Sequence, residues 1–202
     1  MALDQEKSVT EKASISSAVA VQRPHRADAR RNFDALLEAA RTAFAEKGTE
    51  VSLEHIARSA GVGIGTLYRN FPTRQDLFDA VYVGEVEQLC QAAKEVADLP
   101  PWEAFTAWLQ RFVGYVATKR AIYEALNRDS EMFRSCRVAM YAAGEPLLER
   151  AQQAGQARPD ANFDDVLRMI TGITAAGFVD AVQRERVLGI ALDGVRNQPA
   201  GA

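Results

Sequence analysis

Four neighbouring side chains between residues 63 and 72 carry groups that can bind a polyanion. Thr66 and Tyr68 have hydroxyls, Arg69 a guanidinium and Asn70 an amide, and all four can hydrogen-bond phosphates or base edges. Residues 64–70 are predicted to form a short helix. It should end before Pro72, because a proline disfavours helical geometry in the residue that precedes it.

The elements that must position these groups precede them in the sequence. Apolar residues of 33–44 recur at helical spacing, and Gly48 can end that helix. Ser52 can cap a second short helix, which Gly61 ends. Two short helices joined by a glycine-containing turn are typical of a helix-turn-helix, whose second helix enters the major groove of DNA. The segment Val51 to Phe71 therefore predicts a DNA-binding motif.

Gly65 stands inside the predicted second helix of this motif. A glycine there costs about 1 kcal/mol relative to alanine. Close approach of the helix to DNA would explain it, and a tolerated surface glycine is the alternative. Thr73 and Asp76 form a capping-box pattern that begins the next, long helix to about Asp98.

The rest of the chain also has helical patterning, with no sustained alternation of period two. Helices are expected at about 102–118, 120–127, 130–154, 163–180 and 184–196, with Pro146 kinking or splitting the third of these. The predicted fold class is all-α. Its parts are a flexible arm over 1–22, a helix-turn-helix domain over 23–72 and a larger helical regulatory and dimerisation domain over 73–202.

The charge distribution agrees with a polyanion partner for one part of the chain. The net charge is −3, but residues 23–74 hold nine Lys or Arg against six Asp or Glu. Chance fluctuation is the alternative explanation. Neither a membrane span nor a signal peptide is recognisable, so we expect a cytoplasmic protein. Cys90 and Cys136 are isolated, which indicates neither a disulfide framework nor a metal site.

About 55 residues resemble the DNA-binding domain of the tetracycline-repressor (TetR) family. The resemblance is carried by LLEAARTAFAEKG and VSLEHIARSAGVGIGTLYRNFPTRQDLF. Gly63 replaces a usual serine and Asn70 a usual histidine, whereas Gly65-Thr66-Leu67-Tyr68 and Phe71 match.

The resemblance implies roles for individual residues. Thr66, Tyr68 and Asn70 match contact positions, and Ser52 and Arg74 match phosphate contacts. Arg69 is the candidate base reader, since Arg is the commonest specific partner of guanine, with a phosphate contact as the alternative. The predicted DNA-binding residues are Arg30, Ser52, Gly63, Gly65, Thr66, Tyr68, Arg69, Asn70 and Arg74.

The resemblance also implies a homodimer on a pseudo-palindromic operator, acting as a repressor that a small molecule releases. A regulator without a ligand, or an activator, remains an alternative. An apolar or aromatic effector is expected, and core packing is the alternative role of the residues predicted to bind it. These are Trp102, Phe105, Trp108, Phe112, Tyr123, Phe133, Met140 and Tyr141.

The last two predicted helices are the candidate dimer interface, with packing within the chain as the alternative. Small residues there allow close helix approach. The predicted interface residues are Leu167, Ile170, Ile173, Gly177, Leu188, Leu192 and Val195.

An enzyme is a poor alternative, because the only histidines are His25 and His55 and no nucleophile–base pair, phosphate loop or metal spacing occurs. No cofactor or metal is therefore expected. A helical interaction protein that never touches DNA is also disfavoured, by the Gly-Thr-Leu-Tyr helix and its basic flanks.

Overall fold

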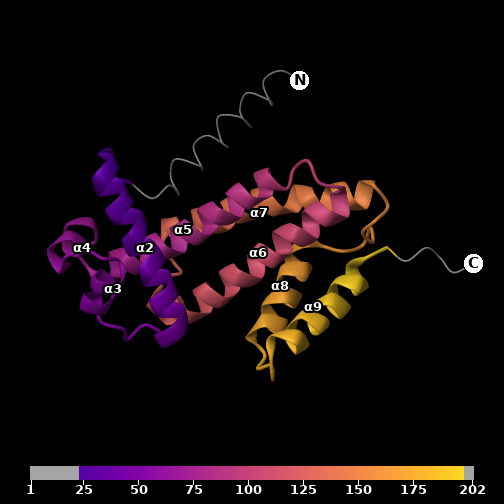
Figure 1. Cartoon of the computed structure of the whole chain (residues 1–202). Coiled ribbons are helices and arrows are strands. Elements are labelled where there is room, and N and C mark those ends of the chain that lie inside the picture. Colours follow the sequence, from indigo (N-terminus) through magenta and orange to yellow (C-terminus); the bar gives the residue numbers. More distant parts are fainter. Residues whose placement is uncertain (1–22, 198–202) are drawn as a thin grey trace, which may run out of the picture. The chain divides into compact units, whose positions relative to one another are not determined.

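The computed structural model describes residues 23–197, and all regular elements in that range are helices, apart from one isolated bridge between Ala157 and Arg196 (Figure 1). The predicted all-α fold is confirmed. The predicted arm over 1–22 lies outside the described residues. The helices are α2 Ala27–Lys47, α3 Leu53–Ser59, α4 Ile64–Asn70, α5 Arg74–Glu95, α6 Pro101–Ile122, a short 3-10 turn Tyr123–Ala125, α7 Glu131–Gln153, α8 Phe163–Ala175 and α9 Ala181–Val195.

The chain divides into two compact units, and α5, α6 and α7 each contribute residues to both. Of the described residues, the N-terminal unit comprises 23–88 together with Thr118–Ala139. The C-terminal unit comprises Leu89–Ala117 and 140–197. The domain boundary predicted after residue 72 falls just before α5, whose first half packs within the N-terminal unit.

Local signals set the helix ends of the N-terminal unit. Gly48 and Gly61 take positive φ angles of 71° and 69°, which glycine adopts without steric cost. The Ser52 hydroxyl oxygen accepts a hydrogen bond from the His55 backbone N–H at 3.2 Å, as expected of an N-cap. Thr73 and Asp76 form the predicted capping box, in which each side chain accepts from the other residue's backbone N–H.

Two aromatic pairs lie at the centre of this unit. The Phe33 and Phe71 rings are 5.0 Å apart, and the Phe44 and Phe78 rings are 4.8 Å apart. Leu67, the one buried residue of α4, is fully enclosed. These contacts fasten α4 and the start of α5 to α2.

Some of the expected helix boundaries were wrong. Helix α6 continues unbroken from Pro101 to Ile122, where two helices were expected to meet near 119. Helix α7 has the expected extent and continues through Pro146, so the proline does not split it, and the alternative of a kink there stays a prediction. Helix α8 ends at Ala175, and α9 begins at Ala181 because Asp180 caps it by accepting from the Gln183 backbone N–H.

Trp108 is the centre of the C-terminal unit. Its indole N–H donates to the Leu89 carbonyl at 3.0 Å, and its ring lies 5.8 Å from that of Phe112 and 5.7 Å from that of Phe163. Gly144 packs directly on it, since an added Cβ would come within 2.5 Å of the indole. Only glycine fits this position of α7 without repacking.

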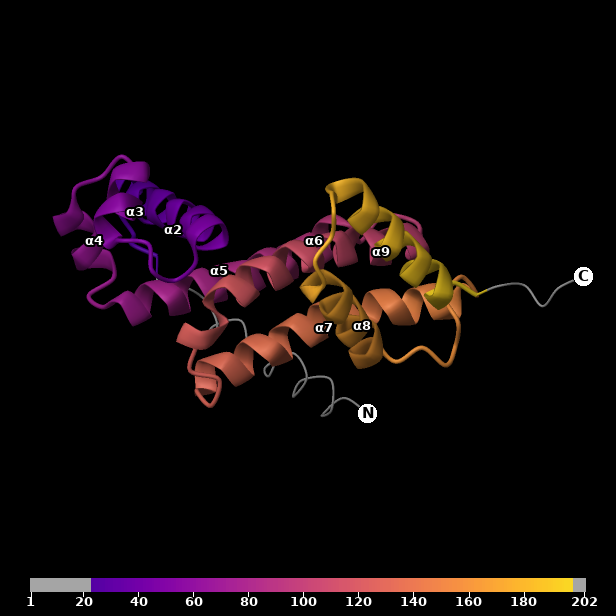
Figure 2. The same cartoon turned by 90° about the horizontal axis from the view of Figure 1, so that it is seen from below.

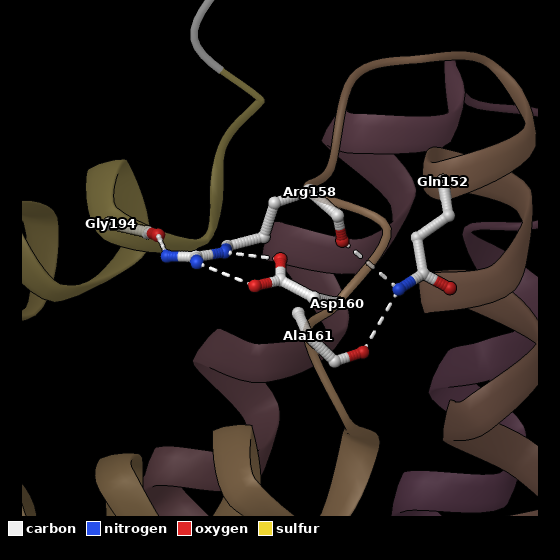
Figure 3. A network of polar contacts seen from close by, with 5 residues as sticks. All are labelled: Gln152, Arg158, Asp160, Ala161 and Gly194. Atoms are coloured by element: carbon white, nitrogen blue, oxygen red, sulfur yellow. Dashed lines mark hydrogen bonds and ion pairs between the residues drawn. The ribbon is translucent and has the colours of Figure 1, made fainter.

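The loop between α7 and α8 holds the end of α9 (Figure 3). The Arg158 guanidinium donates twice to Asp160, at 2.6 and 2.7 Å, and once to the Gly194 carbonyl at 3.4 Å. The Arg158 backbone N–H donates to the Val195 carbonyl at 2.9 Å. Gln152 stiffens the loop by donating to the carbonyls of Arg158 and Ala161. These bonds attach the C-terminal end of α9 to the loop between α7 and α8.

Candidate nucleic-acid interface

Helix α4 presents a polar face around its single buried residue. In both views of the fold it lies at the outer edge of the group formed by α2, α3 and α4 (Figures 1 and 2). Tyr68 is 47% exposed although it is aromatic, and Gly65 and Arg69 are exposed beside it. Thr66 is half-buried. The short helix therefore offers hydroxyl and guanidinium groups from a firmly packed support.

Two of the predicted contact residues of α4 bond to their own helix. The Arg69 guanidinium donates to the Gly65 carbonyl at 3.1 Å and to the Thr66 hydroxyl at 3.0 Å. The Asn70 amide donates to the Thr66 carbonyl of the same helix at 2.7 Å. Arg69 must rotate away from α4 to reach a base, whereas Asn70 keeps a second N–H that can donate to a phosphate.

Two other predicted contacts come from α2 and the start of α3. Ser52 is exposed, and because its oxygen acts as the acceptor in the cap, its hydroxyl hydrogen is free to donate. Arg30 is exposed in the first turns of α2. Sequence reasoning missed the Lys47 ammonium, which lies 3.1 Å from His55 Nε2 beside the start of α3. Lys47 could have been singled out as the last basic residue of α2.

Arg74 is bonded to its own chain through one guanidinium nitrogen, and a phosphate contact for it stays a prediction. Its guanidinium donates to the backbone carbonyls of Thr49 and Val51, which precede α3, and lies 5.5 Å from the centre of the Phe78 ring. The side chain is half-buried. Arg74 thus ties the first turn of α5 to the loop that starts the helix-turn-helix.

The predicted effector residues are divided between the two units. Tyr123 and Phe133 belong to the N-terminal unit, where Tyr123 is exposed and Phe133 stacks on Tyr82 at 5.0 Å. The other six belong to the C-terminal unit: Trp102, Phe105, Trp108, Phe112, Met140 and Tyr141. Four of these six are buried, and Trp102 and Tyr141 are half-buried. They pack as core, and a ligand role for them stays a prediction.

The predicted dimer residues divide by burial. Leu167, Ile170 and Val195 are buried by their own chain, and Ile170 is only 1% exposed. They pack inside the subunit and do not form an exposed surface, so for these three the alternative of packing within the chain is correct. Ile173, Leu188 and Leu192 are half-buried and Gly177 is exposed.

Two apolar residues of α9 that sequence reasoning missed are far more exposed. Val182 is 66% exposed and Ile190 is 67% exposed. They lie outside the apolar stripe of α9 that identified Leu188 and Leu192, and only the packing of the unit shows that they face outward.

A second polar cluster, also missed, joins α2 to α5. Glu85 lies on α5 with its side chain 8% exposed, and its Oε1 is 3.7 Å from the Arg41 Nε on α2. Burial, with a smaller contribution from the neighbouring Glu38, raises the pKa of the Glu85 carboxyl to about 6, while Arg41 and the hydrogen bond from Thr118 oppose the shift. Glu85 occurs four residues after Val81 and four before Leu89, so it lies on the apolar face of the helix. A charged residue on that face could have predicted a buried carboxylate from the sequence.

Two family models match the chain over its two functional parts. Residues 36–81 match the bacterial regulatory proteins of the tetR family, and residues 100–197 match the C-terminal domain of SbtR-like transcriptional regulators. A TetR transcriptional regulator from Streptomyces coelicolor has a similar structure, with 38% identity and a TM-score of 0.73. The match covers 83% of this chain and 99% of that one.

A TetR regulatory protein from Mycobacterium vanbaalenii is 33% identical, with a TM-score of 0.67 and coverage of 86% and 99%. The chain belongs to the TetR family of transcriptional regulators, whose members bind DNA and dimerise. An HTH-type transcriptional regulator of Staphylococcus aureus is 27% identical over 57% of this chain. The match spans 64% of that relative's length.

Within 23–197, no helix is long and apolar enough to cross a membrane. Over the same range, no three His, Cys, Asp or Glu side chains are grouped so that they could hold a metal ion.

We expect Arg74→Ala to lower the free energy of unfolding by about 1–3 kcal/mol, because it leaves two carbonyls without their charged donor. Urea denaturation followed by circular dichroism measures this. The control is Arg58→Ala, which removes the same side chain from an exposed position of α3 and should change stability by less than about 0.5 kcal/mol. Equal effects of the two variants would contradict the tie between α5 and the loop.

We expect Glu85→Gln to stabilise the fold at pH 7.5. The folded pKa of about 6 is above the usual 4.5, so the stability linked to this carboxyl is complete below pH 4.5 and is lost as the pH rises through 6. A shift of that size corresponds to about 2 kcal/mol. Urea denaturation at pH 4.5 and 7.5 should show a gain only at the higher pH. Glu145→Gln, on an exposed position of α7, should show none at either.

Proposed function

We propose that this protein is a homodimeric, sequence-specific repressor that binds a pseudo-palindromic operator through α4 and is released by a small-molecule effector. The exposed face of α4 is the observation that supports this proposal. Tyr68, Gly65 and Arg69 are exposed, while the buried Leu67 packs the helix against the core. Such a protein would act in the cytoplasm, together with the DNA.

The division of roles on this face follows from the bonds already described. Tyr68 and Thr66 position the helix on phosphates, and Ser52 adds a hydroxyl from the start of α3. Arg69 reads a base once it leaves its bonds to Gly65 and Thr66, which exposed hydrogen bonds allow at little cost. Arg74 acts through the loop that it holds, as a positioning residue.

Gly65 supports close contact between α4 and DNA. An added Cβ at this position meets nothing within 4 Å, so no part of the protein requires the glycine. Its φ is not positive, so the backbone does not require it either. A helix surface without side chains lets another molecule approach the backbone, which explains a residue that costs the helix about 1 kcal/mol.

The exposed residues of α9 support the dimer. Val182 and Ile190 lie two turns apart, and leaving both in water is unfavourable unless another surface covers them. The buried Leu167, Ile170 and Val195 hold α8 and α9 within the subunit and so keep this face in place.

The function is tested by capturing genomic fragments with the protein, sequencing them and measuring affinity for the recovered operator by fluorescence anisotropy. We expect Gly65→Ala to raise the free energy of unfolding by up to about 1 kcal/mol and yet to weaken operator binding at least tenfold. The matched control is Gly114→Ala on α6, where a Cβ also meets nothing within 4 Å; it should stabilise without weakening binding. Unchanged operator affinity for Gly65→Ala would contradict the close approach of α4, and recovery of no common sequence would contradict the function.

We expect Ile190→Asp to shift the protein from dimer to monomer, because the interface would have to bury an unpaired carboxylate. Size-exclusion chromatography with light scattering at micromolar concentration measures the mass. Val138→Asp places the same charge at an apolar position of α7 that is 50% exposed and should leave the dimer intact. A wild-type protein that is monomeric throughout would refute the dimer.

A further inference from the structure

A cavity of about 330 Å³ lies between α2 and α5 in the N-terminal unit. Its volume falls within the range of small-molecule sites. Apolar side chains of Leu37 and Val81 form part of its wall, and charged side chains of both helices form the rest. None of the predicted effector or DNA-binding residues lines it.

One carboxylate at this cavity has an unmet hydrogen bond. Glu85 Oε1 is buried and has no hydrogen-bond partner. The nearest cation is the Arg41 Nε, and at 3.7 Å it is too far away to donate. Buried acceptors without partners are uncommon in folded proteins, since desolvation is then uncompensated. The carboxylate is therefore ready to accept from a donor that this chain does not provide.

The side chains that line the cavity include one more carboxylate than guanidinium groups. Arg23 pairs with Asp34 and also with Glu87, which does not line the cavity, and Arg41 pairs closely with Glu38 through two hydrogen bonds. Glu85 is the third carboxylate against these two guanidiniums. The excess charge lies on the group whose hydrogen bond is unmet, so the cavity favours a single positive charge that carries N–H donors.

Gly84 leaves the space beside it in the cavity open. It lines the cavity from the interior of α5, where a glycine destabilises a helix by about 1 kcal/mol relative to alanine. An added Cβ would meet nothing within 4 Å, so no neighbouring atom explains the missing side chain.

We propose that this cavity binds a compact organic monocation, an amine protonated at neutral pH with a short apolar body, whose ammonium group donates to Glu85 Oε1. The apolar body would lie against Leu37 and Val81. The donor displaces the Arg41 guanidinium, which gives up only a contact without a hydrogen bond and keeps its two bonds to Glu38. An organic cation is favoured over a metal ion, because no metal-binding group of side chains occurs within residues 23–197.

The test is isothermal titration of the full chain with cyclohexylamine at pH 7.5, with cyclohexanol as the neutral analogue of the same shape. We expect the amine to bind and the alcohol to bind at least tenfold more weakly. Glu85→Gln should weaken amine binding at least tenfold, whereas Glu145→Gln, which removes one exposed carboxylate from α7, should not. At pH 5.0 the amine should bind about tenfold more weakly than at pH 7.5, since protonation removes the charge on Glu85.

A second variant blocks the cavity without changing charge. Gly84→Leu adds a helix-favouring side chain towards the open space and should also abolish binding. Equal binding of amine and alcohol, amine binding that survives both cavity variants, or no binding of the amine would each overturn the proposal. No DNA is present in this titration, so its failure leaves the proposed function standing, and a failure of operator capture leaves this site standing.

Discussion

The packing of α3, α4 and the first turns of α5 against α2 is the constraint on which the rest of the N-terminal unit depends. Helices of seven residues, such as α3 and α4, are unstable alone in water because nucleation costs more than so few hydrogen bonds return. Burial of Leu67 and the contact of Phe71 with Phe33 supply what α4 lacks. The exposed face of α4 can be polar only because its other face is held so firmly.

Charged side chains in this unit serve structure as well as recognition. Arg74 holds the loop before α3, and the Asn70 amide donates to the Thr66 carbonyl of its own helix; both residues were also predicted to contact phosphate. A side chain that positions the interface has the same charge and polarity as one that touches DNA. The two roles differ in the partners that lie near the side chain in the folded protein, and only the tertiary structure shows these partners.

Helix α5 connects three features of the protein. Its first turn is tied to the helix-turn-helix through Arg74, and its middle carries Gly84 and Glu85 at the cavity next to α2. Its end belongs to the C-terminal unit, where the Leu89 carbonyl accepts from Trp108. A ligand between α2 and α5 would therefore touch the same helix that holds the loop at the start of the motif.

The sequence by itself determined the helices, their caps and the family. Ser52, Gly48, Gly61 and the Thr73–Asp76 box act on neighbouring residues, so their effects can be predicted from spacing alone. Tertiary structure decided which faces are covered. It buried Leu167 and Ile170, left Ile190 in water and enclosed Glu85, because burial depends on residues that are distant in the chain and that no local pattern specifies.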